Sequence, residues 1–186
     1  MSFRWLLVGE GSLIVVAAVW CWLRGISIPY HLDPHALGMA LAATVGFVLV
    51  NFSLYHLSKR ARSPADLHAF LESELFPIFR GVPAWQLVLL SALAGLGEEL
   101  LFRGVIQEEL GIWIASAVFG VLHWPERALW LLAVWAAAMG VALGLLYQTT
   151  GNLLVPALSH ALYDGAALLY LSRGETGTEN AIFEKG

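Results

Sequence analysis

The sequence predicts an all-α fold, a polytopic membrane helical bundle of about six membrane helices plus one interfacial helix. Of the 186 residues, 59% are hydrophobic and only 13% are charged, whereas a soluble domain carries about 25% charged residues. The apolar residues gather in runs close to the ~20 residues that a helix needs to cross a bilayer. Pro, Gly and charged residues separate these runs. We therefore expect an integral membrane protein in contact with the lipid bilayer.

The predicted architecture is a single membrane domain over residues 1–186. It comprises two N-terminal spans (1–62), an interfacial helix and link (63–82), core helices (83–171) and a flexible polar tail (172–186). The net charge is only -4 and no long basic run is present. We therefore expect no nucleic-acid partner.

The first apolar run covers residues 3–23 and is followed by Arg24 and a polar link, 25–34, whose prolines cannot continue a helix. Glu10 lies inside this run, so its carboxylate either stays near the lipid headgroups or meets a partner from another helix. Cys21 lies among apolar residues and is expected to be a buried small side chain. These residues predict the first membrane helix.

The second run covers residues 35–57 and ends at the cationic cluster Lys59-Arg60-Ala61-Arg62. Short loops rich in Lys and Arg stay in the cytoplasm. The cluster therefore predicts that the second helix ends inside the cell, and that the N-terminus and C-terminus are both cytoplasmic. We expect a multi-pass protein of a bacterial inner membrane.

The segment 63–82 differs from its neighbours because polar and apolar residues alternate at helical spacing. Ser63-Pro64 is a helix start signal. This pattern predicts a helix lying along the membrane surface, and an ordinary connecting helix in water is the alternative. The apolar residues that recur at helical spacing are Leu67, Phe70, Leu71, Leu75 and Phe76.

Four further runs follow, and the second of them is short. Residues 112–123 are too few to cross a hydrocarbon core of about 30 Å unaided, so this helix is expected to be tilted or buried within the bundle. Small residues along the spans allow helices to approach closely. The four runs are 84–110, 112–123, 128–149 and 152–171.

Two carboxylates and a guanidinium interrupt the third run. A charged residue at the bilayer centre costs about 2.5 to 3.5 kcal/mol on insertion scales, so it is rarely left there without a partner or a function. Glu99 and Arg103 are four residues apart with the acid first, which predicts an ion pair. Glu98 points about 100° away on the helix and has no such partner. Glu98 is therefore the candidate proton acceptor.

Two other helices carry imidazoles. His123 lies four residues after Phe119 at the end of the short run, and His160 and Asp164 are four apart on the last run. That spacing lets the carboxyl group orient the imidazole. If Glu98 converges with both histidines, the three can deprotonate a water and stabilise the oxyanion formed when water attacks a carbonyl. This is the chemistry of amide hydrolysis.

Other interpretations stay open on these residue types. Carboxylates and histidines in membrane helices also build proton or ion paths, and the Glu99 and Arg103 pair has a purely structural interpretation. The remaining histidines are expected to be structural: His31, His35, His56 and His68.

Three motifs in this order resemble those of the CAAX-protease and bacteriocin-processing (CPBP, or Abi) family of intramembrane proteases, to which the Ras-converting enzyme belongs. The resemblance covers residues 82–171, and the first two helices carry no family motif. The matching residues are Glu98-Glu99-x-x-x-Arg103, Phe119-x-x-x-His123 and His160-x-x-x-Asp164.

The resemblance implies an intramembrane endopeptidase whose substrate is a membrane protein or a lipidated peptide. Glu98 and His123 would activate water, and His160 with Asp164 would stabilise the oxyanion. Asp164 stands where many relatives have Asn, and a charged Asp cannot donate a hydrogen bond. It is therefore either protonated or the group that orients His160. The residues that would support the site structurally are Glu99, Arg103 and Phe119.

Two alternatives accompany this interpretation. The family has also been described as metalloproteases, and zinc would then be held by Glu98, His123 and His160. The chain lacks the compact His-Glu-x-x-His arrangement, so we expect a metal-free glutamate mechanism with no cofactor. The other alternative is a non-enzymatic membrane protein that uses the polar cluster for proton transfer, or as a partner-binding or immunity module.

Overall fold

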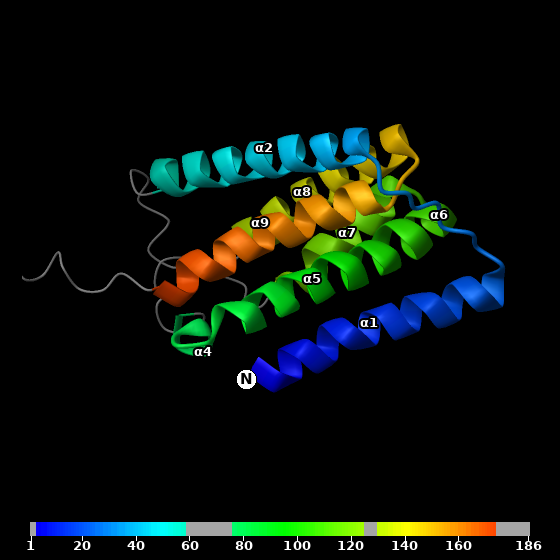
Figure 1. Cartoon of the computed structure of the whole chain (residues 1–186). Helices are drawn as coiled ribbons and strands as arrows, with labels where there is room; N and C mark the ends of the chain where they lie inside the picture. The colour runs from blue at the N-terminus through cyan, green and yellow to red at the C-terminus, as the bar shows by residue number, and fades with distance from the viewer. Residues whose placement is uncertain (1–2, 59–75, 125–129, 174–186) are drawn as a thin grey trace, which may run out of the picture.

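A computed structural model of the chain describes residues 3–58, 76–124 and 130–173. Every regular element in these ranges is helical (Figure 1). In chain order the elements are α1 (Phe3–Arg24), α2 (Pro34–Ser58), α4 (Phe76–Phe79), α5 (Ala84–Leu101), the π-helix η2 (Phe102–Ile106), α6 (Gln107–Leu110), α7 (Ile112–Leu122), α8 (Trp130–Thr150) and α9 (Leu154–Arg173).

The predicted polytopic helical bundle is confirmed. Four helices are long and apolar enough to cross a membrane by length and composition: α1, α2, α8 and α9. The fifth long element is a continuous helical segment in which α5 leads through η2 into α6, and this segment carries the charged residues. As its sequence predicted, α7 is short, with 11 residues, or about 16 Å at 1.5 Å per residue.

Some predictions lie outside the described residues. Of the predicted interfacial segment 63–82, the structure describes residues 76–82, which include α4. The cationic cluster 59–62 and most of the polar tail also fall outside. The orientation that rests on this cluster stays a prediction.

The helices α5 and α9 lie side by side at the centre of the bundle (Figure 1). The first helix, α1, packs against α5, and α2 packs against α9. A third pair, α7 and α8, lies behind them in this view, where α7 contacts η2 and α8 contacts α9. A side chain at the contact of α5 and α9 is therefore enclosed by helices on several sides.

Glycines allow the closest of these contacts. A Cβ atom at Gly95 of α5 would lie 2.6 Å from the backbone nitrogen of Ala161 in α9. A Cβ atom at Gly120 of α7 would lie 2.6 Å from the carbonyl oxygen of Ala133 in α8. Both distances are shorter than real contacts allow, so each pair of helices needs glycine there, as the small residues predicted.

A buried asparagine ties two loops together at one end of the bundle. The side chain of Asn152 donates to the carbonyl oxygen of His31 at 2.7 Å and accepts from the His31 backbone N–H at 3.2 Å. Its Oδ1 also accepts from the N–H of Leu154 at 3.1 Å. The loop between α1 and α2 is thereby fixed to the start of α9.

The next helix, α2, is capped by Asp33, whose pKa is held below its usual value by a hydrogen bond from the Ala36 N–H.

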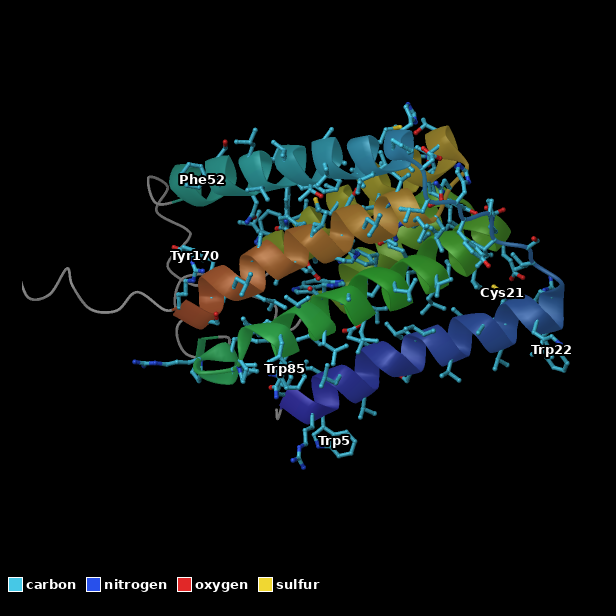
Figure 2. The ribbon with its side chains drawn as sticks, in the orientation of Figure 1. Trp5, Cys21, Trp22, Phe52, Trp85 and Tyr170 are labelled. Atoms are coloured by element: carbon cyan, nitrogen blue, oxygen red, sulfur yellow. The ribbon has the colours of Figure 1, made fainter. Side chains whose placement is uncertain are left out.

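Exposed tryptophans lie near both ends of the bundle. Trp5 and Trp85 lie toward one end, and Trp22 lies at the other (Figure 2). Trp5 and Trp22 are 17 residues apart on α1, which is about 26 Å along a helix. Tryptophan is enriched at membrane interfaces, so the two ends match the two faces of a bilayer. Cys21, expected to be buried, is half-buried beside Trp22.

Candidate active site

The charged motif lies where α5 changes from an α-helix to a π-helix. In η2 the N–H of Gln107 donates to the carbonyl oxygen of Phe102, five residues earlier. Arg103 and Gly104 lie inside this turn and are buried. Single π turns inside helices are frequent at functional sites. Helical spacing alone gave no signal of this turn.

The predicted ion pair between Glu99 and Arg103 is confirmed. The Nε atom of Arg103 lies 2.9 Å from Oε2 of Glu99, and both side chains are fully buried. The guanidinium also lies over the ring of Phe119, 5.2 Å from its centroid. A cation over an aromatic face is attracted by the ring electrons, so Phe119 and Glu99 hold Arg103 from two sides.

The other oxygen of Glu99 holds a residue that the sequence did not pair with it. Oε1 of Glu99 lies 2.9 Å from Nδ1 of His160, which comes from α9. A carboxylate can only accept a hydrogen bond, so Nδ1 of His160 carries the hydrogen. Glu99 thus bridges Arg103 and His160 and fixes the orientation of the imidazole.

The second nitrogen of His160 faces two further carboxylates. Nε2 lies 3.4 Å from Oδ2 of Asp164 and 3.9 Å from Oε2 of Glu98. Asp164 was expected either to be protonated or to orient His160; it contacts Nε2, while Glu99 holds the ring at Nδ1. Oε2 of Glu98 is buried and has no hydrogen-bond partner in the described part of the chain. Glu98 is therefore a buried carboxylate with an oxygen available to a bound water or substrate.

His123 is linked to the site by the ring of Phe119, which contacts both His123 and His160. Its Nδ1 donates to the carbonyl oxygen of Phe119 at 2.8 Å, which leaves Nε2 of a neutral ring free to accept. The two rings stack with centroids 4.4 Å apart, and Phe119 meets His160 edge-on at 6.1 Å. Within the described residues, His123 makes no hydrogen bond or ion pair with Glu98 or His160. The structure thus brings Glu98 and His160 together, and the ring of Phe119 contacts both histidines.

Glu10 of α1 was expected either near the lipid headgroups or beside a partner from another helix. It interacts electrostatically with Asp164, His160 and Glu98, and its Oε2 is buried. Glu10 therefore meets the polar cluster. The signal available in the sequence was a single carboxylate inside an apolar run.

The alternative zinc set of Glu98, His123 and His160 involves the same residues. No group of three His, Cys, Asp or Glu side chains in the described residues is arranged as a metal site. Nδ1 of each histidine donates to a carbonyl or carboxylate oxygen, so Nε2 of each ring would be the atom to hold a metal. The choice between a metal-free and a zinc mechanism stays a prediction.

The fold and the cluster define a polytopic helical membrane protein with a buried carboxylate and imidazole site between two central helices. Residues 80–166 match the family of type II CAAX prenyl endopeptidases, Rce1-like. This segment contains all three motifs, and it excludes Glu10. The resemblance to the CAAX-protease and bacteriocin-processing family is confirmed over this segment.

One curated relative shares the same part of the chain. The uncharacterized protein YpbD of Bacillus subtilis (strain 168) is 41% identical over 85 residues, which are 46% of this chain and 44% of the relative. The match thus spans less than half the length of that relative. No solved structure matches the chain significantly.

Proposed function

We propose that this protein is an intramembrane endopeptidase that hydrolyses a peptide bond of a membrane-embedded or lipid-anchored protein. One observation carries the proposal. Glu98 and His160, from two adjacent central helices, are buried with 3.9 Å between Oε2 and Nε2, and Glu99 fixes the far nitrogen of His160. A general base thus stands beside a potential donor to an oxyanion.

Glu98 and His123 are the groups proposed to activate water. A water bound at Oε2 of Glu98 gives up a proton to that oxygen while its own oxygen attacks the carbonyl carbon of the substrate. The proton then passes from Glu98 to the amine that leaves when the carbon–nitrogen bond breaks. The N–H at Nδ1 of His123 donates to the carbonyl oxygen of Phe119. Nε2 of His123 is therefore the atom that can accept a hydrogen bond from the same water.

His160 is proposed to stabilise the oxyanion. When both ring nitrogens carry hydrogen, the Nδ1–H group donates a hydrogen bond to Glu99, and the Nε2–H group points toward Asp164 and Glu98. A substrate oxygen that enters beside Nε2 competes with Asp164 for this hydrogen. Asp164 therefore keeps the donor directed at the site before substrate arrives, a role that a charged carboxylate can fill.

The depth of the site limits the class of substrate. Both helices that form it are enclosed by apolar helices of a membrane bundle, so the scissile bond must reach it from within or beside the bilayer. The family that matches residues 80–166 is described as type II CAAX prenyl endopeptidase, Rce1-like. A lipid-modified C-terminal segment is accordingly the first substrate class to examine.

The proposal is tested with purified protein in lipid vesicles and candidate lipidated or membrane-embedded substrates, with the new termini identified by mass spectrometry. We expect Glu98→Gln and His123→Ala each to lower cleavage by about 100-fold or more, because general acid–base groups contribute about 10²–10⁴-fold. The matched control is Glu108→Gln, which neutralises an exposed carboxylate on α6. Unchanged cleavage in both site variants would overturn the proposal.

The metal-free form of the mechanism has its own test. The chain lacks the compact His-Glu-x-x-His arrangement of many zinc proteases, so we expect activity to survive a strong chelator. Loss of activity on chelation, with recovery on adding zinc, would instead identify a metalloprotease.

A further inference from the structure

The part of the chain that precedes the segment matched to the protease family contacts the charged motif at both of its ends. A Cβ atom on Gly97, the residue before the two glutamates, would lie 2.8 Å from the backbone oxygen of Glu10 in α1. A Cβ atom on Gly104, the residue after Arg103, would lie 2.5 Å from Cδ1 of Ile28 in the loop between α1 and α2. The motif therefore lies between two close contacts with residues outside the matched segment.

Ile28 fills the space that a side chain at Gly104 would need. The three atoms nearest to the Cβ position of Gly104 all belong to Ile28, with Cδ1 at 2.5 Å, Cγ1 at 3.3 Å and Cγ2 at 4.0 Å. Gly104 is buried inside η2, and Ile28 is half-buried. Small residues let neighbouring segments approach the backbone of a helix closely. The side chain of Ile28 thus packs directly on the backbone of the π turn.

The loop that carries Ile28 is fixed on both sides of it. Four residues earlier, Nε of Arg24 lies 2.8 Å from Oε1 of Glu109. One residue later, the carbonyl oxygen of Pro29 accepts a hydrogen bond from the N–H of Leu153 at 3.0 Å. The contact of Ile28 with the π turn is therefore held in place from both directions along the loop.

The π turn is supported from two sides. The ring of Phe119 meets that of Phe102 at the start of η2, with centroids 4.9 Å apart. Ile28 packs two residues further along, on roughly the opposite side of the helix. Arg103 lies between these two contacts along the chain, with its Nε atom 2.9 Å from Oε2 of Glu99. The position of the guanidinium relative to Glu99 therefore depends on both contacts.

We propose that Ile28 is a positioning residue of the site: it holds the π turn so that Arg103 meets Glu99. Glu99 in turn orients the imidazole of His160 through Nδ1. This inference rests on the proposed hydrolysis, because that reaction needs His160 to be oriented. Ile28 acts through the backbone beside Arg103 and not on the substrate, so its removal lowers the rate of the chemical step and leaves substrate binding intact.

The first test is the kinetics of cleavage in lipid vesicles, expressed per folded molecule. Ile28→Ala removes all three of the atoms that pack on Gly104. We expect kcat to fall by about 10-fold or more with KM little changed, because a misplacement of about 1 Å far from the chemistry can cost about 10²-fold. Ile28→Val removes only Cδ1, and its kcat is expected to lie closer to that of wild type than to that of Ile28→Ala.

The matched control is Leu32→Ala in the same loop. It removes as many carbon atoms as Ile28→Ala, but from a side chain that is 71% exposed. We expect kcat and KM of this variant to equal those of wild type. An unchanged kcat in Ile28→Ala, or an equal loss in Leu32→Ala, would overturn the proposal.

A second readout does not depend on cleavage. The Nε–H group of Arg103 is buried against Glu99, so it exchanges its hydrogen with water only when the structure opens. Its exchange is measured by NMR on ¹⁵N-labelled protein in detergent micelles, and the signal is assigned by its loss in Arg103→Lys. We expect exchange about 10-fold faster in Ile28→Ala, because the π turn opens more readily, and the wild-type rate in Leu32→Ala.

The backbone amides of α8 separate positioning from general stability in the same experiment. They are expected to exchange at the wild-type rate in Ile28→Ala. If they accelerate by the same factor as the Arg103 signal, Ile28 only stabilises the whole fold and the proposal is wrong. It is also wrong if the Arg103 signal is unaffected. If wild type cleaves nothing but the Arg103 signal alone responds to Ile28→Ala, the proposed hydrolysis fails while the positioning of Arg103 by Ile28 stands.

Discussion

Two Glu–Arg ion pairs in this protein have nearly the same geometry and very different surroundings. Arg103 and Glu99 lie 2.9 Å apart with both side chains fully buried. Arg24 and Glu109 lie 2.8 Å apart with side chains 61% and 26% exposed. Water screens the second pair and not the first. Distance alone therefore does not indicate how strongly the fold depends on a pair.

The partners of each pair extend the contrast. The buried pair continues to His160, so it connects stability with the orientation of a site residue. The exposed pair is joined by the indole N–H of Trp20, 3.2 Å from Glu109, and tethers α1 to α6 at the end of the bundle away from the N-terminus. The buried pair supports a site, and the exposed pair supports a helix contact.

The largest effect is expected from Arg103→Ala. Removing the cation leaves the buried Glu99 with His160 as its remaining partner, and breaking a buried ion pair costs about 3–5 kcal/mol. We expect a lower yield of folded protein and a lower melting temperature in detergent, measured by differential scanning fluorimetry. A normal yield with wild-type stability would show that the Glu99–Arg103 pair does not contribute this much to folding stability.

A double substitution sharpens the same point. Replacing a buried ion pair with apolar side chains of similar volume is often neutral or stabilising, so Glu99→Leu with Arg103→Met is expected to be more stable than Arg103→Ala. Because Nδ1 of His160 then loses its acceptor, we expect the double variant to lose cleavage activity. If the double variant recovered both stability and cleavage, the Glu99–His160 hydrogen bond would not be needed for activity.

An intermediate effect is expected from Gly95→Ala. The added methyl group would lie 2.6 Å from the backbone of Ala161, so α5 and α9 must move apart, at a cost of about 1–3 kcal/mol. The Glu99–His160 hydrogen bond crosses this contact and the Arg24–Glu109 pair does not. Cleavage rate is therefore expected to fall along with the denaturation midpoint, and an unaffected rate would contradict the need for close approach.

The smallest effect is expected from Arg24→Ala. An exposed pair contributes little and is weakened further by salt. We expect the melting temperature at physiological salt to be indistinguishable from that of wild type, with any difference confined to low ionic strength. A large loss that persists in high salt would show that the tether of α1 matters more than its exposure indicates.

The sequence predicted those parts of the site that depend on spacing along one helix. The Glu99–Arg103 and His160–Asp164 contacts are both four residues apart, and both are present. Helix ends at Gly111 and near Pro34 were also predicted within a residue or two, because Gly and Pro act locally.

Contacts between helices could not be predicted in this way. The Glu99–His160 hydrogen bond joins residues 61 positions apart, and it depends on the register of α5 against α9, which the backbone contact at Gly95 restricts. No periodic pattern encodes that register. The same applies to Glu10, whose partners lie on α5 and α9.

The π turn has a consequence for chain length. A π-helix accommodates one more residue per turn than an α-helix, and one residue corresponds to a rotation of about 100°. Deleting one residue between 102 and 106 would restore a regular helix and leave the orientation of α6 nearly unchanged, because the π turn takes up its extra residue without rotating the helix further. Gln107, which donates to the carbonyl oxygen of Gly144 at 3.1 Å, would then still face α8. The turn is therefore a place where this helix can gain or lose one residue without changing which side chains face its neighbour.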